Sequence, residues 1–224
     1  NFRSSGKIAF WMIRDGSGFI QAILDSKDLP GEKWEEAQKV TLETSVKITA
    51  TVAKHPKKEE FELHVKDFEF VQISDEYTIG KKEHGPDFLL DNRHLWLRSS
   101  KQWAIQRVRN TLIHATYEFF NKNNFIKIDS PILTPSACEG TTELFEIDYF
   151  GDRKAYLSQS GQLYLEAAIF AHGRVFDFGP VFRAEKSKTR RHLTEFWMMD
   201  AEMAFTTLEE NLKIQEDLVR YMVS

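Results

Sequence analysis

The chain has 224 residues, of which 42% are hydrophobic and 13% aromatic, a composition typical of folded globular proteins and unlike that of disordered ones. Its formal net charge of −4 provides no global positive field, so any nucleic acid must be bound by a local patch. The single cysteine excludes an internal disulfide framework. The sequence has neither an apolar stretch long enough to span a bilayer nor a signal-peptide pattern, so we expect a cytoplasmic protein without membrane partners.

The first third of the chain has the pattern of a small β domain. Strands are predicted at 7–14, 19–24, 45–53, 60–65 and 68–73, with a turn at 15–18 and a short helix at 33–38. Short strands with one helix favour an OB-fold barrel, and an SH3-like barrel fits nearly as well. The chain starts at Asn1, without a methionine and inside a strand-like pattern, so we expect a trimmed N-terminus.

Residues 76–98 are rich in polar residues, Gly and Pro and have no sustained period, which predicts a hinge linker. We therefore expect one domain at 1–75 and a second at 99–224. The second begins with a predicted helix at 100–121, whose apolar stripe is Ile105, Val108, Leu112, Ala115 and Phe119. A strand at 125–129 follows and ends at Ser130–Pro131. These features are equally those of an ordinary amphipathic helix on a sheet.

The remaining elements surround a basic loop. A strand at 155–157 precedes a helix that starts near 162, and strands at 175–178 and 181–185 are separated by a break at Gly179–Pro180. The loop at 186–192 leads to a strand at 193–205, which completes a hairpin, and the last helix is predicted at 208–223. The loop and its ends carry six basic residues: Arg183, Lys186, Lys188, Arg190, Arg191 and His192. Guanidinium groups at the end of a strand bind phosphate well, which predicts a phosphate site. Composition alone also fits a charged turn in solvent.

This hairpin carries a specific pattern: Phe-Arg-Ala-Glu at 182–185, Arg-His-Leu-x-Glu-Phe at 191–196 and Asp-x-Glu at 200–202. It resembles the second signature of class II aminoacyl-tRNA synthetases, in the subgroup for aspartate, asparagine and lysine. The helix, strand and proline before it resemble the first signature, which implies a homodimer through residues 101–131. Residues 92–98 resemble asparaginyl members in particular, because aspartyl members usually carry an acidic residue where Trp96 lies.

The resemblance implies an α+β fold, with an OB-fold barrel followed by part of the class II antiparallel sheet and its flanking helices. It also implies ATP, Mg²⁺, tRNA and an amino acid as ligands. Arg183 would clamp the α-phosphate and the substrate carboxylate, Phe196 would stack on adenine, and Glu185 would accept from its amino group. Arg191 and His192 would hold the distal phosphates. The implied ATP-binding set is Arg183, Glu185, Arg191, His192, Leu193 and Phe196.

The implied amino-acid site consists of Glu139, Gln162, Glu166 and Asp200. Glu139 and Gln162 would take the substrate ammonium, assisted by Asp200. Aspartyl members carry a lysine where Leu165 lies and a proline at Gly161, so the missing cation and the acid at Glu166 favour asparagine over aspartate. Glu139 could equally be a plain loop carboxylate, and Glu166 an exposed helix residue. Cys138 has no base or second cysteine in its surroundings, so we expect neither a nucleophile nor a metal ligand there.

The N-terminal region resembles the anticodon-binding OB domain of the same subgroup, through Ser5–Phe10, Ile13–Gly16, Gly18 and Gln21. In that subgroup the positions of Phe10, Gln21 and Glu62 read the middle anticodon base, a uridine. Stacking by Phe10 and hydrogen bonding by an amide and a carboxylate suit an unpaired base. Without the resemblance, Phe10 in an apolar strand would be assigned to the core, and Glu59 or Glu60 could take the place of Glu62.

The glycine-rich third class II signature and the late acidic magnesium ligand have no counterpart before Ser224, so we expect a fragment of a longer enzyme and predict no metal-ligating residue. The function implied is ATP-dependent activation of asparagine and its transfer to tRNA. The alternatives are an aspartyl or non-discriminating enzyme, a non-catalytic RNA-binding module, and an ancestral asparagine synthetase.

Overall fold

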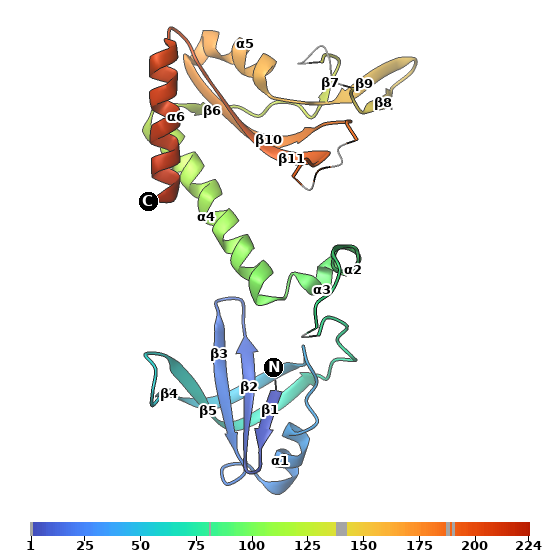
Figure 1. Ribbon diagram of the computed structural model, residues 1–224, viewed down its shortest axis with the longest axis vertical. Coiled ribbons are helices and arrows are strands. Elements are labelled where there is room, and N and C mark those ends of the chain that lie inside the picture. The colour runs from blue at the N-terminus through green and yellow to red at the C-terminus, as the bar shows by residue number, and fades with distance from the viewer. Residues whose placement is uncertain (1, 81, 138–142, 187–188, 190) are drawn as a thin grey trace. The chain divides into compact units, whose positions relative to one another are not determined.

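The computed structural model describes residues 2–80, 82–137, 143–186, 189 and 191–224. The chain forms two compact units, residues 1–99 and 100–224, each of which has its own apolar core (Figure 1). In the described part of the chain, every helix is too short or too polar to cross a lipid bilayer.

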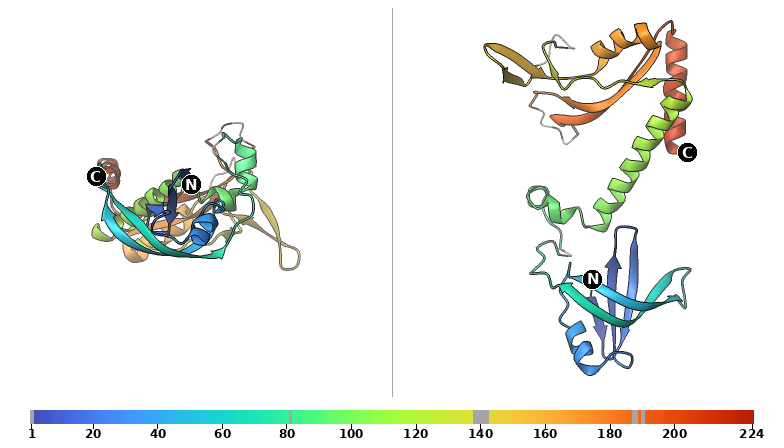
Figure 2. Two further views of the ribbon diagram at one scale, coloured as in Figure 1. Left: turned by 90° about the horizontal axis from the view of Figure 1, so that it is seen from below. Right: turned by 180° about the vertical axis from the view of Figure 1, so that it is seen from behind.

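The first unit contains one five-stranded sheet with the strand order β1-β2-β3-β5-β4. All neighbouring strands are antiparallel except β3 and β5, and a helix joins β3 to β4. This arrangement of five strands and one helix agrees with the expected OB-fold, and the sheet is strongly twisted (Figure 2). The elements are β1 (Phe2–Ser5), β2 (Ile8–Arg14), β3 (Phe19–Asp25), α1 (Gly31–Ala37), β4 (Ser45–Lys54) and β5 (Phe61–Gln72).

Strict alternation along these strands separates a buried face from an outer face. On β2, Ala9 and Trp11 are buried, whereas the alternate residues Phe10 and Met12 are not. The buried set also includes Phe68 of β5, whose ring meets that of Trp11 edge-on at 5.0 Å between centroids. Phe10 belongs to neither the buried cluster nor the apolar residues packed against it.

Strand β5 differs from the prediction of two strands at 60–65 and 68–73, since it runs without interruption from Phe61 to Gln72. Its register against β4 shifts between Thr49 and Ala50, which pair with Asp67 and Val65. Lys66 is therefore the extra residue of a β-bulge. The extra residue interrupts the alternation of apolar residues between 65 and 68, and this interruption had led to the prediction of two separate strands.

The predicted linker contains two short helices, α2 (Pro86–Asp91) and α3 (Arg93–Trp96). The segment also contacts the first unit: Arg98 Nη1 lies 3.3 Å from Glu43 Oε2, and the same carboxylate pairs with Arg14. Glu43 has a left-handed backbone with a φ of 67°, which these two arginines help to hold. The predicted hinge linker therefore contains helical turns at 86–91 and 93–96, and its role as a hinge stays a prediction.

The second unit contains two three-stranded sheets, ordered β11-β10-β6 and β7-β9-β8. In the first, β10 is antiparallel to β11 and parallel to β6. The elements are α4 (Ser100–Lys122), β6 (Ile126–Lys127), β7 (Leu133–Thr134), β8 (Glu146–Tyr149), β9 (Arg153–Leu157), α5 (Gln162–His172), β10 (Arg174–Phe182), β11 (Glu195–Met203) and α6 (Leu208–Val223).

Helices α4 and α6 pack against each other and cover one face of the β10–β11 hairpin (Figure 1). Phe120 of α4 stacks on Phe176 of β10 at 4.7 Å between ring centroids. The predicted stripe on α4 is only partly buried: Phe119 is in the core, but Ile105 and Val108 are 44% and 60% exposed. The first half of the helix extends beyond the core, so its apolar residues lack cover within the described chain.

Strand β10 passes through Gly179 and Pro180, where a break was predicted. Pro180 pairs with Trp197 of β11, whereas β6 pairs with β10 only at Val175 and Phe176. At Pro180 the strand thus has one strand neighbour, and a strand edge tolerates a residue that lacks an amide hydrogen. The strand can continue because no ladder bond is lost on its open side.

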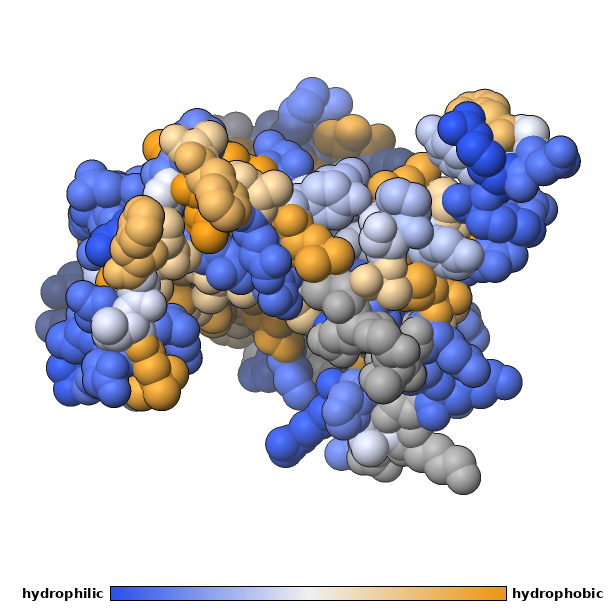
Figure 3. All heavy atoms as spheres, turned by 90° about the horizontal axis from the view of Figure 1, so that it is seen from above, coloured by the Kyte–Doolittle hydropathy of each residue, from blue (hydrophilic) through white to orange (hydrophobic). Residues whose placement is uncertain are grey.

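Apolar and polar side chains alternate over the face of the molecule drawn in Figure 3. Large apolar side chains that are exposed in the second unit include Phe150, Phe170 and Phe205. Phe205 also has a positive φ of 56°, at the turn from β11 towards α6. A capping box then starts α6, in which Thr207 Oγ1 accepts from the Glu210 amide and the Glu210 carboxylate accepts from the Thr207 amide.

Candidate active site and nucleic-acid-binding face

The β10–β11 hairpin has a second face, opposite to α4 and α6. Residues paired across an antiparallel ladder lie on the same side, so the pair Val181 and Phe196 shares this face with the pair Asp177 and Asp200. The Arg183 amide donates to the Thr194 carbonyl at 2.9 Å, which extends the ladder past Phe182. By alternation Arg183 lies on the same side as Val181 and Phe196.

The loop between β10 and β11 lies next to Arg183 in the chain. Glu185, Arg191 and Leu193 are exposed, and so is His192, whose Nδ1 is hydrogen-bonded to Thr189 Oγ1. These four residues thus lie at the solvent-exposed end of the hairpin, where a bound polyphosphate could be reached by cationic side chains. The lysine at 188 and the arginine at 190, which were predicted for the same patch, lie outside the described residues.

The turn before α5 is held by Asp200 of β11. Asp200 Oδ2 accepts from Ser160 Oγ and from the Gly161 amide, both at 3.0 Å. Ser160 Oγ in turn accepts from the Gln162 amide at 3.0 Å. This network joins the start of α5 to the carboxylate, so the backbone of Gln162 is linked to Asp200 through Ser160.

Three carboxylates are close on this side of the sheet: Glu166 of α5 and Asp200 and Glu202 of β11. Burial raises the pKa of Glu202, and the charges of Glu166 and Asp200 raise it further. Gln162 Nε2 donates to Glu166 Oε1 at 2.9 Å. Leu165, one position earlier on α5, is fully buried. The site is therefore rich in acceptors, which suits a substrate that brings hydrogen-bond donors.

The first unit has an outer face, formed by the outer sides of β2, β3 and β5, on which apolar and polar side chains are mixed. Gln21 pairs with Glu62 across the parallel β3–β5 ladder, and Phe10 pairs with Ile23 two residues along β3. The three predicted nucleic-acid residues therefore share one face. Glu62 is 4% exposed, and its Oε1 lies 3.1 Å from Nε2 of His64 on the same strand.

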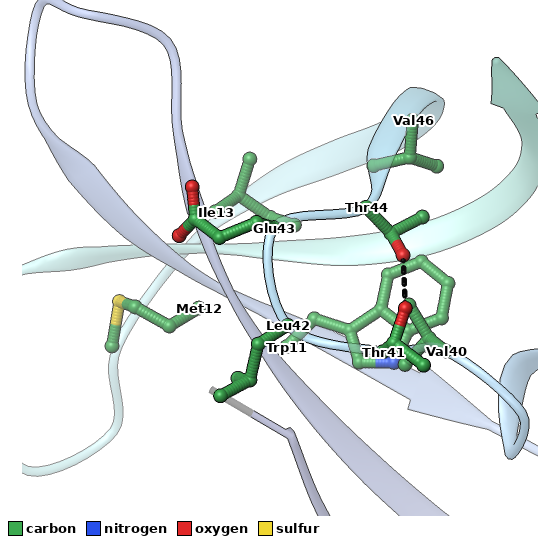
Figure 4. A pocket seen from close by; sticks show the side chains of 9 residues that line it. All are labelled: Trp11, Met12, Ile13, Val40, Thr41, Leu42, Glu43, Thr44 and Val46. Atoms are coloured by element: carbon green, nitrogen blue, oxygen red, sulfur yellow. Dashed lines mark hydrogen bonds between the residues drawn. The ribbon is translucent and has the colours of Figure 1, made fainter. Parts of the chain in front are cut away.

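A small pocket lies at the edge of the same unit (Figure 4). Its volume is about 60 Å³, which admits water but not a nucleotide base. Thr41 and Thr44 are hydrogen-bonded there at 2.9 Å, and Trp11 contributes a buried indole N–H without a hydrogen-bond partner among the described residues. Water in this pocket is a natural partner for that N–H, and the pocket is not a candidate ligand site.

The structure thus groups most of the predicted residues. Arg183, Phe196, Asp200, Gln162 and Glu166 belong to one side of the hairpin and to the helix above it. Glu139 lies outside the described residues. Sequence reasoning did not single out Ser160, Asp177, Glu202 or His64, although the Asp-x-Glu spacing of 200 and 202 already indicated that the two acids face the same way. In the described chain, no three potential ligands are grouped as a metal site requires.

Two family models match the chain. Residues 85–224 match the model described as tRNA synthetases class II (D, K and N), and residues 1–71 match the OB-fold nucleic acid binding domain described for tRNA anticodon binding. Together they cover nearly all of the two units.

Solved structures agree with both matches. Asparaginyl-tRNA synthetase from Pyrococcus horikoshii, complexed with asparaginyl-adenylate, is 42% identical with a TM-score of 0.92 over 100% of this chain and 52% of that one. Asparaginyl-tRNA synthetase from Entamoeba histolytica is 30% identical with a TM-score of 0.89, again over 100% and 52%. A putative aspartyl-tRNA synthetase from Leishmania major Friedlin is 31% identical with a TM-score of 0.82, over 99% and 46%. The chain spans about half the length of these proteins.

Proposed function

The chain belongs to the class II tRNA synthetases (D, K and N), and on that premise we propose that it is part of an asparaginyl-tRNA synthetase. The enzyme would activate asparagine with ATP and transfer it to the 3′ end of its tRNA. The observation that carries the proposal is the hairpin face, which Arg183 and Phe196 share with a cluster of carboxylates tied to α5.

In activation the asparagine carboxylate attacks the α-phosphate of ATP and pyrophosphate leaves. The reaction depends on positioning and charge neutralisation more than on proton transfer. Arg183 would hold the α-phosphate and the attacking carboxylate, because a guanidinium donates to both through separate N–H groups. Phe196 would stack on adenine from the same face, with Glu185 and Leu193 next to the base. Arg191 and His192, at the exposed loop, would hold the distal phosphates.

The choice of asparagine rests on charge. Glu166, Asp200 and Glu202 place negative charge around the start of α5, and the pKa of Glu202 is already raised by its two neighbours. A substrate with a side-chain carboxylate would add a fourth negative group, whereas an amide N–H₂ donates to a carboxylate. Asp200 and Gln162, with the undescribed Glu139, would take the α-ammonium.

The OB-fold unit would bind the anticodon. Phe10 provides a ring for stacking, while Gln21 and the adjacent Glu62 offer an amide and a carboxylate to the hydrogen-bonding edge of one base. Gln21 and Glu62 are direct partners in the ladder, and because Glu62 is 4% exposed, the Gln21 amide would make the main contact with the base.

A homodimer is part of the proposal. Ile105 and Val108 on the first half of α4 are exposed, as are Ile126, Ile132 and Leu133 further along. A second copy packed on residues 101–131 would remove this apolar surface from water. The single cysteine is consistent with a cytoplasmic location.

Magnesium would accompany the nucleotide, where it neutralises polyphosphate charge.

The test is ATP–pyrophosphate exchange by the full-length enzyme that contains this chain, with asparagine and aspartate as separate substrates. We expect exchange with asparagine and at least tenfold less kcat/KM with aspartate. Equal exchange with both would favour the non-discriminating alternative, and exchange with aspartate alone the aspartyl enzyme. Absence of exchange with either, together with retained tRNA binding, would support the non-catalytic module and refute the proposal.

A further inference from the structure

Gly161 occupies a position where no side chain fits. A Cβ atom built on Gly161 would lie 2.6 Å from Asp177 Oδ2 and 2.7 Å from Ser130 Oγ, closer than real contacts allow. Its own φ of −81° is ordinary, so backbone conformation does not explain the glycine. The explanation is the neighbouring carboxylate of Asp177, which approaches the Gly161 Cα directly.

Asp177 is itself held in place. It is 7% exposed, its Oδ2 accepts from the Ser130 amide at 3.3 Å, and its Oδ1 lies 3.2 Å from Lys127 Nζ. Burial alone would lower the pKa of Lys127, but the hydrogen bonds that its ammonium donates to Asp129 and Asp177 outweigh this effect and raise that pKa. Lys127 therefore remains charged and neutralises Asp177 at any physiological pH.

The turn at 160–162 thus lies between two carboxylates from paired strands. Asp200 accepts its amide and hydroxyl hydrogens, and Asp177, the ladder partner of Asp200, packs against Gly161. The cavity left between them measures about 20 Å³, which is space for one water molecule. Ser130 Oγ, in its wall, is buried without a hydrogen-bond partner among the described residues, and such a water would supply one.

We infer that Asp177 is a positioning residue for amino-acid binding and that residue 161 is a glycine because its missing side chain leaves room for the Asp177 carboxylate. The inference rests on the proposed function. Asp177 fixes the distance of the 160–162 turn from the sheet. The position of the turn decides whether Asp200 accepts from Ser160 and Gly161, and in which direction the Gln162 side chain points. Asp177 does not contact the reacting atoms. Truncation of the Asp177 side chain, or a methyl group on Gly161, shifts the turn away from Asp200 and frees the Asp200 carboxylate from its two donors.

The ATP side of the site has a different support. Arg183 and Phe196 are carried by the ladder of β10 and β11 itself, beyond the Asp177–Asp200 pair. A displaced turn should therefore weaken amino-acid binding selectively. A purely structural defect would instead lower the active fraction, which reduces kcat and leaves both KM values unchanged.

The experiment measures KM for asparagine, KM for ATP and kcat by ATP–pyrophosphate exchange in the full-length enzyme. The variants are Asp177→Ala, Asp177→Asn, Gly161→Ala and the double variant Gly161→Ala/Asp177→Ala. Asp177→Asn is the matched control, because it keeps the size of the side chain and an oxygen that accepts from the Ser130 amide. Thermal unfolding of each variant identifies any that fail to fold.

We expect Asp177→Ala and Gly161→Ala each to raise KM for asparagine tenfold or more, with KM for ATP within twofold of the wild type. Asp177→Asn should stay within threefold for both. Adding Gly161→Ala to Asp177→Ala should raise KM by less than threefold, because the clash with the Asp177 carboxylate has been removed and the Ser130 hydroxyl, which has no hydrogen-bond partner among the described residues, can rotate away.

An unchanged KM for asparagine in Asp177→Ala would overturn the inference, as would multiplicative effects in the double variant or equal increases in both KM values. If Gly161→Ala does not fold, the comparison of Asp177→Ala with Asp177→Asn decides. A wild-type enzyme without exchange activity would refute the proposed function instead, so the two failures are distinguishable.

Discussion

Replacing Phe10 by alanine separates two roles that an aromatic residue on a strand can have. Phe10 lies outside the apolar cluster of the first unit, whereas Phe68 is 2% exposed within it. Phe68→Ala should therefore cost about 3–5 kcal/mol of unfolding free energy, and Phe10→Ala only about 1 kcal/mol. If Phe10 stacks on an anticodon base, its loss should weaken tRNA charging by ~1–3 kcal/mol, or about 5- to 150-fold in kcat/KM.

The assay compares aminoacylation of tRNA with ATP–pyrophosphate exchange in the full-length enzyme, and urea unfolding in both phenylalanine variants. Charging should fall while exchange stays within twofold, because Phe10 and the hairpin belong to different units. Gln21→Ala should follow the same pattern. The reasoning fails if exchange falls as far as charging, or if Phe10→Ala is as destabilising as Phe68→Ala.

Three further variants test the remaining assignments. Arg183→Ala should reduce exchange by at least 100-fold, equivalent to about 3 kcal/mol of transition-state stabilisation, with an unchanged melting temperature; near wild-type exchange would exclude the catalytic role. Glu166→Gln should reduce the kcat/KM ratio for asparagine over aspartate, and an unaltered ratio would place discrimination elsewhere. Glu43→Gln should cost roughly 1 kcal/mol of unfolding free energy at pH 7. The hydrogen bond from Arg14 lowers the pKa of Glu43 below its ordinary 4.5, despite burial. The stabilisation by the ionised Glu43 is therefore complete above pH 4.5 and disappears as the pH falls through the folded-state pKa. A difference in unfolding free energy between Glu43→Gln and the wild type that does not change with pH would contradict this reasoning.

Local patterns predicted most of the elements, and the exceptions have physical causes. The helix at 208–223 was predicted to the residue, because its amphipathic period and its Thr207 cap are both local signals. The break expected at Pro180 and the gap expected at Lys66 are absent, because a single strand neighbour at Pro180 and a bulge at Lys66 accommodate them. Neither pairing pattern can be read from residues that are adjacent in the chain.

The candidate site shows the same division between local and long-range information. Arg183 and Phe196 could be found because they lie in one continuous motif, and their roles remain predictions. Asp177 was missed because its significance depends on two residues that are distant from it in the chain. Ser130 is brought to it by the β6–β10 pairing, and Gly161 by the turn before α5. A lone acid in an apolar strand gives no signal of this kind in a single sequence.

The boundary between the units has a consequence for biosynthesis. Each unit is formed by one uninterrupted stretch, 1–99 and then 100–224, so the OB-fold unit can be complete before the second unit leaves the ribosome. The second unit has no such freedom. Within the described residues, strand β6 pairs only with β10, which is synthesised after the β8–β9 hairpin and α5. The apolar faces of α4 and β6 therefore stay uncovered until β10 has been synthesised. Chaperone binding during translation should therefore concentrate on the segment from α4 to β6, while the OB-fold unit emerges already protected.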